Sequence, residues 1–506
     1  MTTALYPDDK YNQELVEKLH PGHWKNPAPL ERYNLVVIGA GPAGLVAAAG
    51  AAGLGAKVAL IERHLLGGDC LNFGCVPSKA LLSAAHSIYE ARRSAKFGFT
   101  FEGAGTLDFA KVMAGLRKKR NDMAHHDSVE RFTALGIDVF LGDGQFISPS
   151  CAEVSGKKLN FHRAVIATGA RASLPPISGL AEASPLTNET LFSLTELPKR
   201  LIIIGAGPIG CEMAQSFCRF GSEVTLIEMA DRIMPTEDAD ASAVLTKQLE
   251  QEGVNILINA KVTQAENSGS HKAVTVNGNT IEADEILVAA GRIPNIEGLN
   301  LGAAGVEYHG RGVTVNDRLQ TTSSKIYAAG DICSAFQFTH SADSMAKIVL
   351  QNALFFGRKK VSDLVMPWAT YTSPEVAHVG MTAVEAAEQG DKIITLTAQM
   401  SDVDRAILEE ETDGFARVHV DKKTGRILGA TMVSSHAGES ITQMALAITS
   451  GLKISAIGAT IHPYPIQADV WKKLANNYLK RSFTPKIAKI FKVFLTLFSR
   501  HKRLAP

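Results

Sequence analysis

The chain has 506 residues, enough for two to four domains, and its apolar content of 45% is ample for sizeable cores. A formal net charge of +1 argues against nucleic acid as the main partner. Six cysteines in so long a chain, with no apolar signal segment near Met1, indicate the reducing cytoplasm.

The first 33 residues are polar and contain Pro21, Pro27 and Pro29, so we expect an extended arm. The buried-strand run NLVVI then leads into Gly39, Gly41 and Gly44, an alanine-rich helix and a second strand, VALIE, that ends on Glu62. Glycines at this spacing let a pyrophosphate rest on the helix N-terminus, and the acid accepts ribose hydroxyls. This strand, turn, helix and acid order predicts a dinucleotide site.

The segment GGDCLNFGCVPSK sets Cys70 and Cys75 five positions apart. On a continuous helix such residues lie about 7.5 Å apart along the axis, so only a distorted first turn would let the sulfurs bond. A bond of this kind is strained and reducible, which favours catalysis over a structural role. Gly68 allows close backbone approach to a ligand, and Lys79 favours thiolate over thiol. The alternative is a pair of unrelated buried thiols.

A second fingerprint, RLIIIGAGPIG, repeats the design at Gly205, Gly207 and Gly210, and its second strand ends on Glu228. Two copies predict two bound dinucleotides. Glu228 would hydrogen-bond a free 2′-hydroxyl and repel a 2′-phosphate, which favours NADH. Arg232 lies close enough in sequence to leave NADPH as an alternative. We interpret the other cysteines as packing residues: Cys151, Cys211, Cys218 and Cys333.

With these motifs the chain resembles the class I pyridine nucleotide-disulfide oxidoreductases, the family of dihydrolipoamide dehydrogenase, glutathione reductase and mercuric reductase, over roughly residues 33–480. The resemblance implies an α/β fold with two Rossmann-like domains, for FAD and NAD(P), and a C-terminal α+β dimerisation domain. It also implies a homodimer whose active sites borrow residues from the partner. The expected domains are a 1–33 arm, a discontinuous 34–190 and 296–366 FAD domain, a 191–295 NAD(P) domain, a 367–480 interface domain and a 481–506 tail.

The resemblance also assigns roles to individual residues. Cys70 would be the interchange thiol and Cys75 the charge-transfer thiol against the flavin, with Lys79 near flavin N5 and paired with Glu212. The AVIATGA and KIYAAGD segments would close the FAD site, Asp331 lying near the ribityl or phosphate region. The residues implied for FAD are Gly39, Gly41, Gly44, Glu62, Gly68, Lys79, Thr168, Gly169, Asp331 and Ala342, and those for NAD(P) are Gly205, Gly207, Gly210, Glu228 and Gly291.

The segment IHPYPIQADVWKK stands where disulfide-reducing members of the family carry His-Pro-Thr-x-x-Glu. Aligning on Pro465 puts Tyr464 in place of the histidine and Asp469 in place of the glutamate. Aligning on His462 instead leaves Gln467 where the acid belongs. Tyrosine in this place is typical of mercuric reductases, so we expect Tyr464 to act as a hydrogen-bond donor or metal contact and keep His462 as an alternative base.

The expected activity is therefore NAD(P)H oxidation through FAD and a Cys70–Cys75 disulfide, with Hg²⁺ as a substrate at the two thiols and no structural metal. Mercuric reductases also carry a vicinal cysteine pair near the C-terminus, and this chain has no cysteine after Cys333. Two alternatives remain open. One is a dihydrolipoamide dehydrogenase-type oxidoreductase acting on a small-molecule disulfide, and the other is a membrane-surface NADH:quinone-type dehydrogenase.

The C-terminal tail is basic, with eight Lys or Arg and no acid from Lys480 to Pro506. Its apolar residues recur at helical spacing on one face: Ile487, Ile490, Phe491, Phe494, Leu497 and Phe498. This pattern predicts a basic amphipathic helix that contacts the inner face of the membrane peripherally. The alternative is a helix docked on its own dimer.

Overall fold

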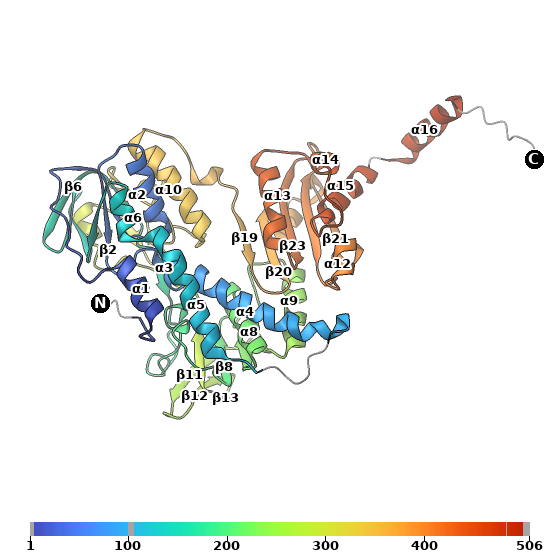
Figure 1. Ribbon diagram of the computed structural model, residues 1–506. Coiled ribbons are helices and arrows are strands. Elements are labelled where there is room, and N and C mark those ends of the chain that lie inside the picture. Colours follow the sequence, from blue (N-terminus) through green and yellow to red (C-terminus); the bar gives the residue numbers. More distant parts are fainter. Residues whose placement is uncertain (1–4, 100–105, 482, 499–506) are drawn as a thin grey trace, which may run out of the picture. The chain divides into compact units, whose positions relative to one another are not determined.

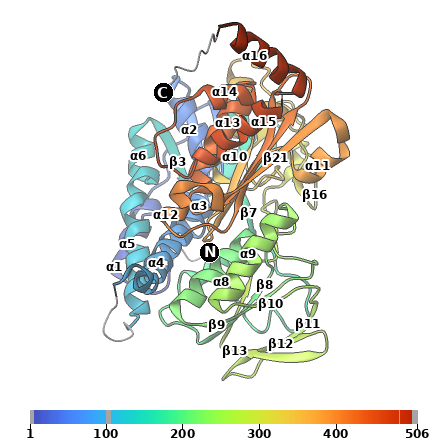
Figure 2. The same cartoon turned by 90° about the vertical axis from the view of Figure 1, so that its right-hand side faces the viewer.

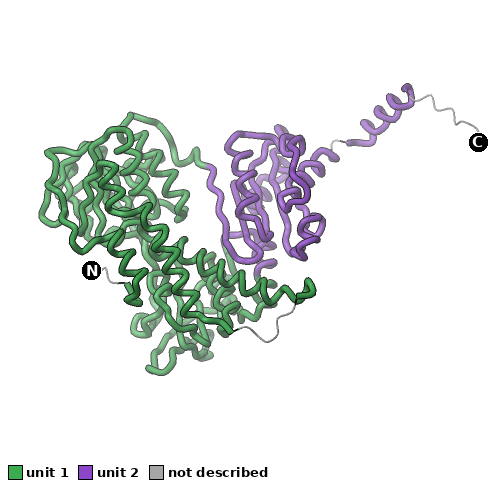
Figure 3. The backbone as a smooth tube through the Cα atoms, viewed as in Figure 1, with its two compact units in different colours: residues 1–235, 246–364 green, residues 236–245, 365–506 purple. Residues whose placement is uncertain are grey.

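The structure is a computed structural model that describes residues 5–99, 106–481 and 483–498. The chain divides into two compact units, residues 1–235 with 246–364 and residues 236–245 with 365–506 (Figure 3). Each unit contains hydrophobic core clusters of its own. The expected further division of the first unit into FAD and NAD(P) domains remains a prediction.

The first sheet of the first unit combines parallel strands with an antiparallel extension. Its strands are β1 (Tyr33–Ile38), β2 (Val58–Glu62), β3 (Ile137–Leu141), β4 (Gly144–Ser148), β5 (Cys151–Val154), β6 (Lys157–Ile166) and β18 (Ile326–Ala328). The order is β3-β2-β1-β6-β5-β4, and β18 also pairs with β6. The strands β1, β2, β3, β6 and β18 run parallel, and their apolar runs are buried, as expected for strands covered on both faces.

Two helices, α2 (Pro42–Gly53) and α10 (Thr339–Leu354), pack against each other and share a core cluster with the parallel strands (Figure 1). The other helices of this unit, apart from α9, are α1 (Lys10–Leu19), α3 (Gly68–Asn72), α4 (Cys75–Arg93), α5 (Phe109–Met123), α6 (Val129–Ala134), α7 (Asn188–Leu191) and α8 (Pro208–Phe220). The short 3-10 segments are η1 (Ser94–Phe97), η2 (Ala124–Asp127), η3 (Leu301–Ala304) and η4 (Val361–Asp363).

A second parallel sheet, in the order β10-β9-β8-β14, repeats the β1-α2-β2 arrangement as β8-α8-β9 (Figure 2). Beside it stands an antiparallel meander, β11-β12-β13. The bounds are β8 (Arg200–Ile204), β9 (Glu223–Ile227), β10 (Asn255–Leu257), β11 (Val262–Asn267), β12 (Lys272–Val276), β13 (Asn279–Ala283) and β14 (Glu285–Val288). Two small pairs complete the unit: β7 (Ala170–Ala172) with β15 (Arg292–Pro294), and β16 (Tyr308–His309) with β17 (Gly312–Val313).

The N-terminal segment contains the helix α1, where an extended arm is expected from the sequence. Asp9 caps this helix by accepting a hydrogen bond from the Asn12 amide at 3.0 Å. Leu15 and Leu19, four residues apart and on one helix face, are fully buried in the core of the first unit. The expectation was wrong for this segment because the prolines that suggested an extended chain all follow the helix.

The second unit is built on a five-stranded antiparallel sheet in the order β19-β20-β23-β22-β21. Its strands are β19 (Pro367–Thr370), β20 (Glu375–Gly380), β21 (Ile393–Gln399), β22 (Phe415–Asp421) and β23 (Ile427–Ser434). Its helices are α11 (Ala383–Glu388), α12 (Asp404–Leu408), α13 (Ala437–Thr449), α14 (Ile454–Ala459), α15 (Asp469–Arg481) and α16 (Pro485–Phe498), and its 3-10 segments are η5 (Gly390–Lys392) and η6 (Met400–Asp402). The helix α9 (Ala239–Glu252) has its first residues in this unit and the rest in the first.

The predicted tail helix is confirmed as α16 over residues 485–498, and the rest of the tail lies outside the described residues. All of the apolar side chains predicted to form one face of α16 are exposed. In the part of the chain that the structure describes, the helices are all too short or too polar to cross a membrane.

Candidate active site

Cys70 and Cys75 lie on either side of a break between two helices. Cys70 is in α3, Cys75 is the first residue of α4, and the chain turns at Phe73 and Gly74 between them. A Cβ on Gly74 would lie 2.9 Å from the backbone oxygen of Asp69, so only glycine fits this turn. The sequence suggested one distorted helix. The structure instead ends one helix and starts another, and this break brings the two thiols within hydrogen-bonding reach.

The two thiols are free in the structure and differ in acidity. A hydrogen bond from the Cys70 thiol, the Thr339 hydroxyl 3.3 Å away and the charge of Lys79 lower the pKa of Cys75 to about 6, against the opposing effect of burial. The same contact, together with burial, raises the pKa of Cys70 well above its ordinary value. The N-terminus of α4 further favours an anion at Cys75. At neutral pH the pair therefore carries one negative charge, on Cys75.

Lys79 and Glu212 form an ion pair between α4 and α8, which pack together in the first unit. The Lys79 Nζ lies 3.0 and 2.9 Å from the two carboxylate oxygens. The side chain of Glu212 is only 4% exposed, so its charge requires a partner. The pairing expected from the family resemblance is confirmed, and it fixes an ammonium group one helical turn from Cys75.

Asp69, which is not among the predicted site residues, connects the segment that contains the two cysteines to two other segments of the first unit. Its Oδ1 accepts a hydrogen bond from Asn188 at 2.8 Å, and its Oδ2 lies 3.3 Å from a guanidinium nitrogen of Arg292. Arg292 also lies 3.5 Å from the Asp331 carboxylate. Burial raises the pKa of Asp331, and Arg292 opposes that rise. The only sequence signal for this contact is an acid directly before Cys70.

The first fingerprint has the geometry of a pyrophosphate cradle. Gly39 has a left-handed φ of 103°, and a Cβ on Gly44 would lie 1.8 Å from the Gly39 oxygen, so helix and strand meet only with glycine there. Glu62 accepts hydrogen bonds from the amides of Ala40 at 2.7 Å and His64 at 2.8 Å. Its carboxylate has further lone pairs to accept from a ribose. These residues fit a dinucleotide at the N-terminus of α2.

Other residues predicted for FAD lie beside this cradle. Gly41 and Gly68 meet backbone to backbone, since a Cβ on Gly68 would lie 2.5 Å from the Gly41 Cα. The nucleotide loop and the start of the cysteine loop are therefore adjacent. Ala342, on the first turns of α10, faces Gly330, where an added Cβ would lie 3.5 Å from the Ala342 Cβ. The structure thus brings together predicted residues from three distant segments of the chain.

Thr168 and Gly169, at the end of β6, are held by Asn295. The Thr168 hydroxyl donates to the Asn295 carbonyl at 2.8 Å, and the Asn295 amide donates to the Gly169 carbonyl at 2.9 Å. Gly291 has a left-handed φ of 105° and accepts a hydrogen bond from the Ser173 amide at 3.0 Å. The predicted FAD and NAD(P) segments are thus joined here through β7 and β15.

The second fingerprint repeats the first in detail. Gly205 has a φ of 102°, Gly207 caps α8, and a Cβ on Gly210 would lie 1.9 Å from the Gly205 oxygen. The structure therefore forms a second cradle at a helix N-terminus, which fits a second dinucleotide.

Glu228 is oriented like Glu62 in the first site. It accepts hydrogen bonds from the amides of Ala206 at 2.8 Å and Ala230 at 2.9 Å. Arg232, the cation that left NADPH open, lies 3.2 Å from the Asp231 carboxylate and also donates to a carbonyl within its own loop. Backbone amides therefore fix the Glu228 carboxylate, whereas the Arg232 guanidinium makes its contacts within its own loop.

His462 and Tyr464 occupy different surroundings in the second unit. His462 Nδ1 lies 3.5 Å from the Asp469 carboxylate, its Nε2 lies 3.2 Å from the Gln443 side chain, and its side chain is 5% exposed. Tyr464 is 74% exposed and donates its hydroxyl hydrogen bond to Asp404 at 2.9 Å, which raises the pKa of the phenol. The motif alignment on Pro465 made Asp469 the acid that accompanies Tyr464. In the structure Asp469 instead lies beside His462. Sequence reasoning missed Asp404 and Gln443, which come from other helices.

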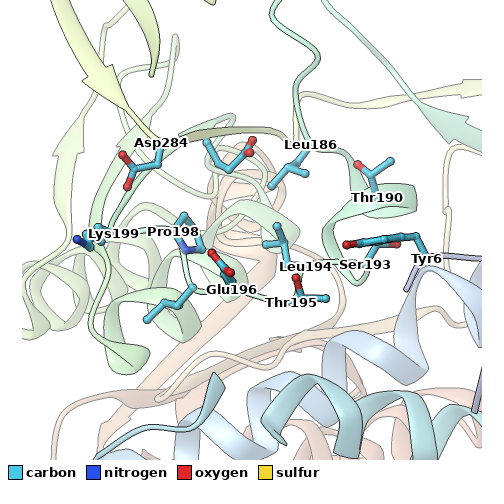
Figure 4. A pocket seen from close by; sticks show the side chains of 12 residues that line it. Tyr6, Leu186, Thr190, Ser193, Leu194, Thr195, Glu196, Pro198, Lys199 and Asp284 are labelled. Atoms are coloured by element: carbon cyan, nitrogen blue, oxygen red, sulfur yellow. The ribbon is translucent and has the colours of Figure 1, made fainter. Parts of the chain in front are cut away.

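A separate surface hollow of about 610 Å³ lies in the first unit (Figure 4). Its lining comes from Tyr6, Leu186, the 190–199 segment, and Asp284 and Glu285 at the start of β14. Within the described part of the chain, the predicted site residues lie outside this lining. The hollow therefore plays no part in the cysteine chemistry.

Two dinucleotide cradles beside a dithiol loop define a pyridine nucleotide-dependent flavoprotein class. Residues 33–346 match the family described as pyridine nucleotide-disulphide oxidoreductase, and residues 366–475 match the dimerisation domain of that family. The chain belongs to this family. It is an enzyme that uses FAD and NAD(P)H and acts on sulfur groups or metal ions, and the predicted mixed α/β fold is confirmed.

The chain is similar to relatives of two different names. The chain is 38% identical to the mercuric reductase of Lysinibacillus sphaericus, over 89% of this chain and 83% of the relative. It is 34% identical to the dihydrolipoyl dehydrogenase of Chlamydia trachomatis, over 88% and 96% of the two chains. Among solved structures, the HOCl-induced flavoprotein disulfide reductase RclA from Escherichia coli is similar with a TM-score of 0.79 and 30% identity, covering 88% of this chain and 99% of that one.

Proposed function

We propose that the enzyme passes two electrons from NADH to a thiophilic divalent metal ion, with Hg²⁺ as substrate and small thiols as its carriers. The observation that carries this proposal is the exposure of Tyr464, 74%, against 5% for the His462 side chain. A group that serves the cysteine pair of a partner subunit must be accessible on its own subunit. The accessible group is a phenol, which is a poor base at neutral pH but a good hydrogen-bond donor and metal contact.

The relatives support the same substrate, because mercuric reductases stand among those most similar to this chain. A dithiol-disulfide enzyme needs an accessible proton acceptor for the interchange thiol. His462 is instead buried between Asp469 and Gln443, so we assign it a positioning role for the Tyr464 segment. A dihydrolipoamide dehydrogenase-type activity is the second candidate, and it would require His462 to become exposed.

Residues of the first unit would have separate roles in this reaction. When bound, FAD accepts a hydride equivalent from NADH and makes its electron pair available beside the thiols. Cys75 would lie against the flavin as the thiolate, and Cys70 would be the first sulfur to meet the substrate. Lys79, fixed by Glu212, would hold a positive charge beside the reacting groups. The two thiols take Hg²⁺ from its small-thiol carriers, and the net reaction is NADH + Hg²⁺ → NAD⁺ + H⁺ + Hg⁰.

The proposal includes three further features of the enzyme. It works as a homodimer, because the chain carries the dimerisation domain of the family and Tyr464 must meet the cysteines of a partner. It works in the cytoplasm, because six cysteines in 506 residues fit a reducing compartment. It prefers NADH to NADPH, because Glu228 would repel a 2′-phosphate and Arg232 is engaged in its own loop. Cofactor contacts follow the two glycine fingerprints described above.

The test is NADH oxidation by the purified holoenzyme with Hg²⁺ in excess thiol, lipoamide, glutathione disulfide or a quinone. We expect turnover with Hg²⁺ that Cys75→Ser abolishes and Tyr464→Phe lowers about 10-fold. Tyr478→Phe, the same change on α15, is the matched control and should leave the rate unaltered. Lipoamide turnover that is lost in His462→Gln would contradict the proposal and favour the dihydrolipoamide dehydrogenase-type activity. Quinone reduction at full rate in Cys70→Ser would favour the membrane-surface dehydrogenase.

We also propose that α16 holds the enzyme peripherally on an anionic membrane surface. The apolar side chains predicted to share one face are between 36% and 75% exposed. Lys486, Lys489 and Lys492 lie among them in sequence, and each cation near an anionic surface contributes about 1 kcal/mol. Inserted phenylalanines would add apolar contact with the lipid.

Flotation with phosphatidylserine-containing vesicles tests this second proposal. The full chain should float at low salt, and a chain ending at Phe483 should not. Vesicles of phosphatidylcholine alone are the control for charge and should bind weakly. Unchanged flotation of the truncated chain would contradict the proposal, and loss of the dimer on truncation would favour a helix docked on the dimer.

A further inference from the structure

The buried side chain of Asn72 closes the loop that contains the two cysteines. Asn72 is the last residue of α3 and is fully buried. Its amide nitrogen donates to the carbonyls of Leu66 at 3.0 Å and Gly68 at 2.9 Å, which holds the turn before α3. Its own backbone carbonyl, at the break before Cys75, accepts a hydrogen bond from Arg120 at 2.8 Å. The break is therefore held from outside the loop.

Arg120, on α5, connects this carbonyl to the N-terminal helix. One guanidinium nitrogen donates to the Asn72 carbonyl, and the other donates to the side-chain oxygen of Asn12 on α1. Arg120 is 3% exposed, and burial lowers its pKa to about 10. In the part of the chain that the structure describes, no carboxylate lies within ion-pair distance of Arg120, and the charge of Asp9, which pairs with Arg117, only partly opposes the effect of burial on the Arg120 pKa. A buried cation that depends on neutral oxygens is sensitive to the loss of either one.

The helix α1 lies beside α5 (Figures 1 and 2) and makes other contacts that do not reach the cysteine loop. Arg117 pairs with Asp9 at 2.5 Å, and the Lys18 ammonium donates to the Asn121 side chain at 2.7 Å. These contacts dock α1 on α5 as the Asn12 contact does. The Arg117–Asp9 pair is linked to the relay, because Asp9 also accepts a hydrogen bond from the Asn12 amide and its charge acts on Arg120. The Lys18 contact ends on Asn121 and supplies the matched control.

We propose that α1 is a positioning element of the redox pair: Asn12 holds Arg120, and Arg120 holds the Asn72 carbonyl at the break that brings the Cys70 and Cys75 sulfurs together. The proposal rests on Cys70 and Cys75 being the redox pair of the proposed function. It does not depend on which acceptor the enzyme uses. Asn12, Arg120 and Asn72 are positioning residues, since they act on the thiols through the backbone.

Removing the hydrogen bond between Asn12 and Arg120 should shift the equilibrium between the dithiol and the disulfide of Cys70 and Cys75 toward the dithiol. Two thiols held close together form a disulfide more readily than two thiols on a mobile loop, because their effective concentration is higher. Without the Asn12 contact the disulfide should therefore be easier to reduce. The thiol hydrogen bond that lowers the pKa of Cys75 should weaken as well, so the thiolate should appear at higher pH.

The experiment compares Asn12→Ala, Asn12→Asp and Lys18→Met as holoenzymes. Each is equilibrated with glutathione redox buffers, and the Cys70–Cys75 disulfide fraction is measured by thiol labelling and mass spectrometry. We expect Asn12→Ala to favour the dithiol about 10-fold, equivalent to about 30 mV. Asn12→Asp keeps an acceptor for Arg120 but loses the hydrogen bond that the Asn12 side-chain nitrogen donates to the Pro7 carbonyl at 2.8 Å, and the thiol couple should stay as in the wild type. Lys18→Met removes the Asn121 contact, weakens the docking of α1 and should leave the couple unchanged.

Three outcomes decide between the possibilities. A shift in Asn12→Ala alone, with a matching rise in the pH at which the Cys75 thiolate forms, supports the positioning role. Equal shifts in Asn12→Ala and Lys18→Met, or no shift in either, overturn it and leave the proposed function intact. If the wild-type pair forms no disulfide in any buffer, the redox role of the pair is wrong, and the positioning role falls with it.

Discussion

Lys79 and Glu212 are joined by two hydrogen bonds of 3.0 and 2.9 Å although 133 positions separate them along the chain. The carboxylate is buried and the ammonium is partly exposed, so the pair fixes the lysine more than it stabilises the fold. Its importance therefore lies in where it holds a positive charge, one helical turn from Cys75.

Replacing Glu212 by Gln should release Lys79 from its fixed position. We expect the rate of thiol reduction, followed by stopped-flow absorbance after mixing with NADH, to fall about 10-fold. The melting temperature should fall modestly, since the lysine can still reach solvent. Glu223→Gln, an exposed change in the same unit, is the control. Equal rates in the two variants would contradict a role for the fixed charge.

The acidity of Cys75 should be visible in alkylation. Because its pKa is lowered to about 6, the thiolate is present at pH 7 and is lost as the pH falls through 6. The rate of iodoacetamide labelling of the reduced enzyme should follow this titration, with Cys70 reacting much more slowly. Cys70→Ala removes the main cause of the shift, so the midpoint of the Cys75 titration in this variant should move upward toward the model-peptide value of about 8.5. A midpoint that stays near 6 in Cys70→Ala would assign the shift to Lys79 instead.

Cofactor preference should depend on the charge of Glu228. We expect kcat/KM to be higher with NADH than with NADPH in the wild type. Glu228→Gln removes the repulsion of a 2′-phosphate and should narrow that ratio about 10-fold. Arg232→Gln should leave the ratio unaltered, because this arginine bonds within its own loop. A wild-type preference for NADPH would show that another cation serves the second site.

Glu237 should make the free energy of unfolding of the second unit depend on pH. Its carboxylate accepts a hydrogen bond from the Trp368 indole at 2.6 Å, but burial raises its pKa to about 7. The unfolded state has a pKa near 4.5, so the neutral form favours the folded state, and this stability is lost as the pH rises through 7. The free energy of unfolding should fall by about 3 kcal/mol between pH 5 and pH 8 from this group.

Denaturant unfolding at the two pH values provides the measurement. Glu237→Gln stays neutral and should be more stable than the wild type at pH 8 and equal to it at pH 5. Glu388→Gln, an exposed change in the same unit, should keep the wild-type dependence. An unchanged dependence in Glu237→Gln would show that other groups cause it.

Both nucleotide cradles could be predicted from the sequence because their chemistry is local. A helix that meets a strand through Gly39 and Gly44 needs glycine at those spacings whatever surrounds it. The ion pair of Lys79 with Glu212 could be predicted only through the family resemblance, since no pattern in the chain links the two residues.

Contacts set by tertiary packing escaped prediction. The prolines after α1 favoured an extended chain, whereas Leu15 and Leu19 are buried in a core cluster that includes residues of η2 and α6, more than one hundred positions away. The pairing of His462 with Asp469 crosses a turn that motif alignment cannot follow, so the acid was assigned to Tyr464. The position of Asp69 directly before Cys70 does not predict its partner, because Arg292 lies more than two hundred positions away.

The hydrogen bonds that Glu228 accepts from the amides of Ala206 and Ala230 limit how such an enzyme can change its coenzyme during evolution. The residue that would discriminate between the two nucleotides is also a structural tie of the loop that receives them. A single exchange toward a phosphate-binding side chain would therefore loosen that loop before it gained a new contact. Adaptation to the other coenzyme pool should proceed through compensating loop changes first, with the acid replaced last.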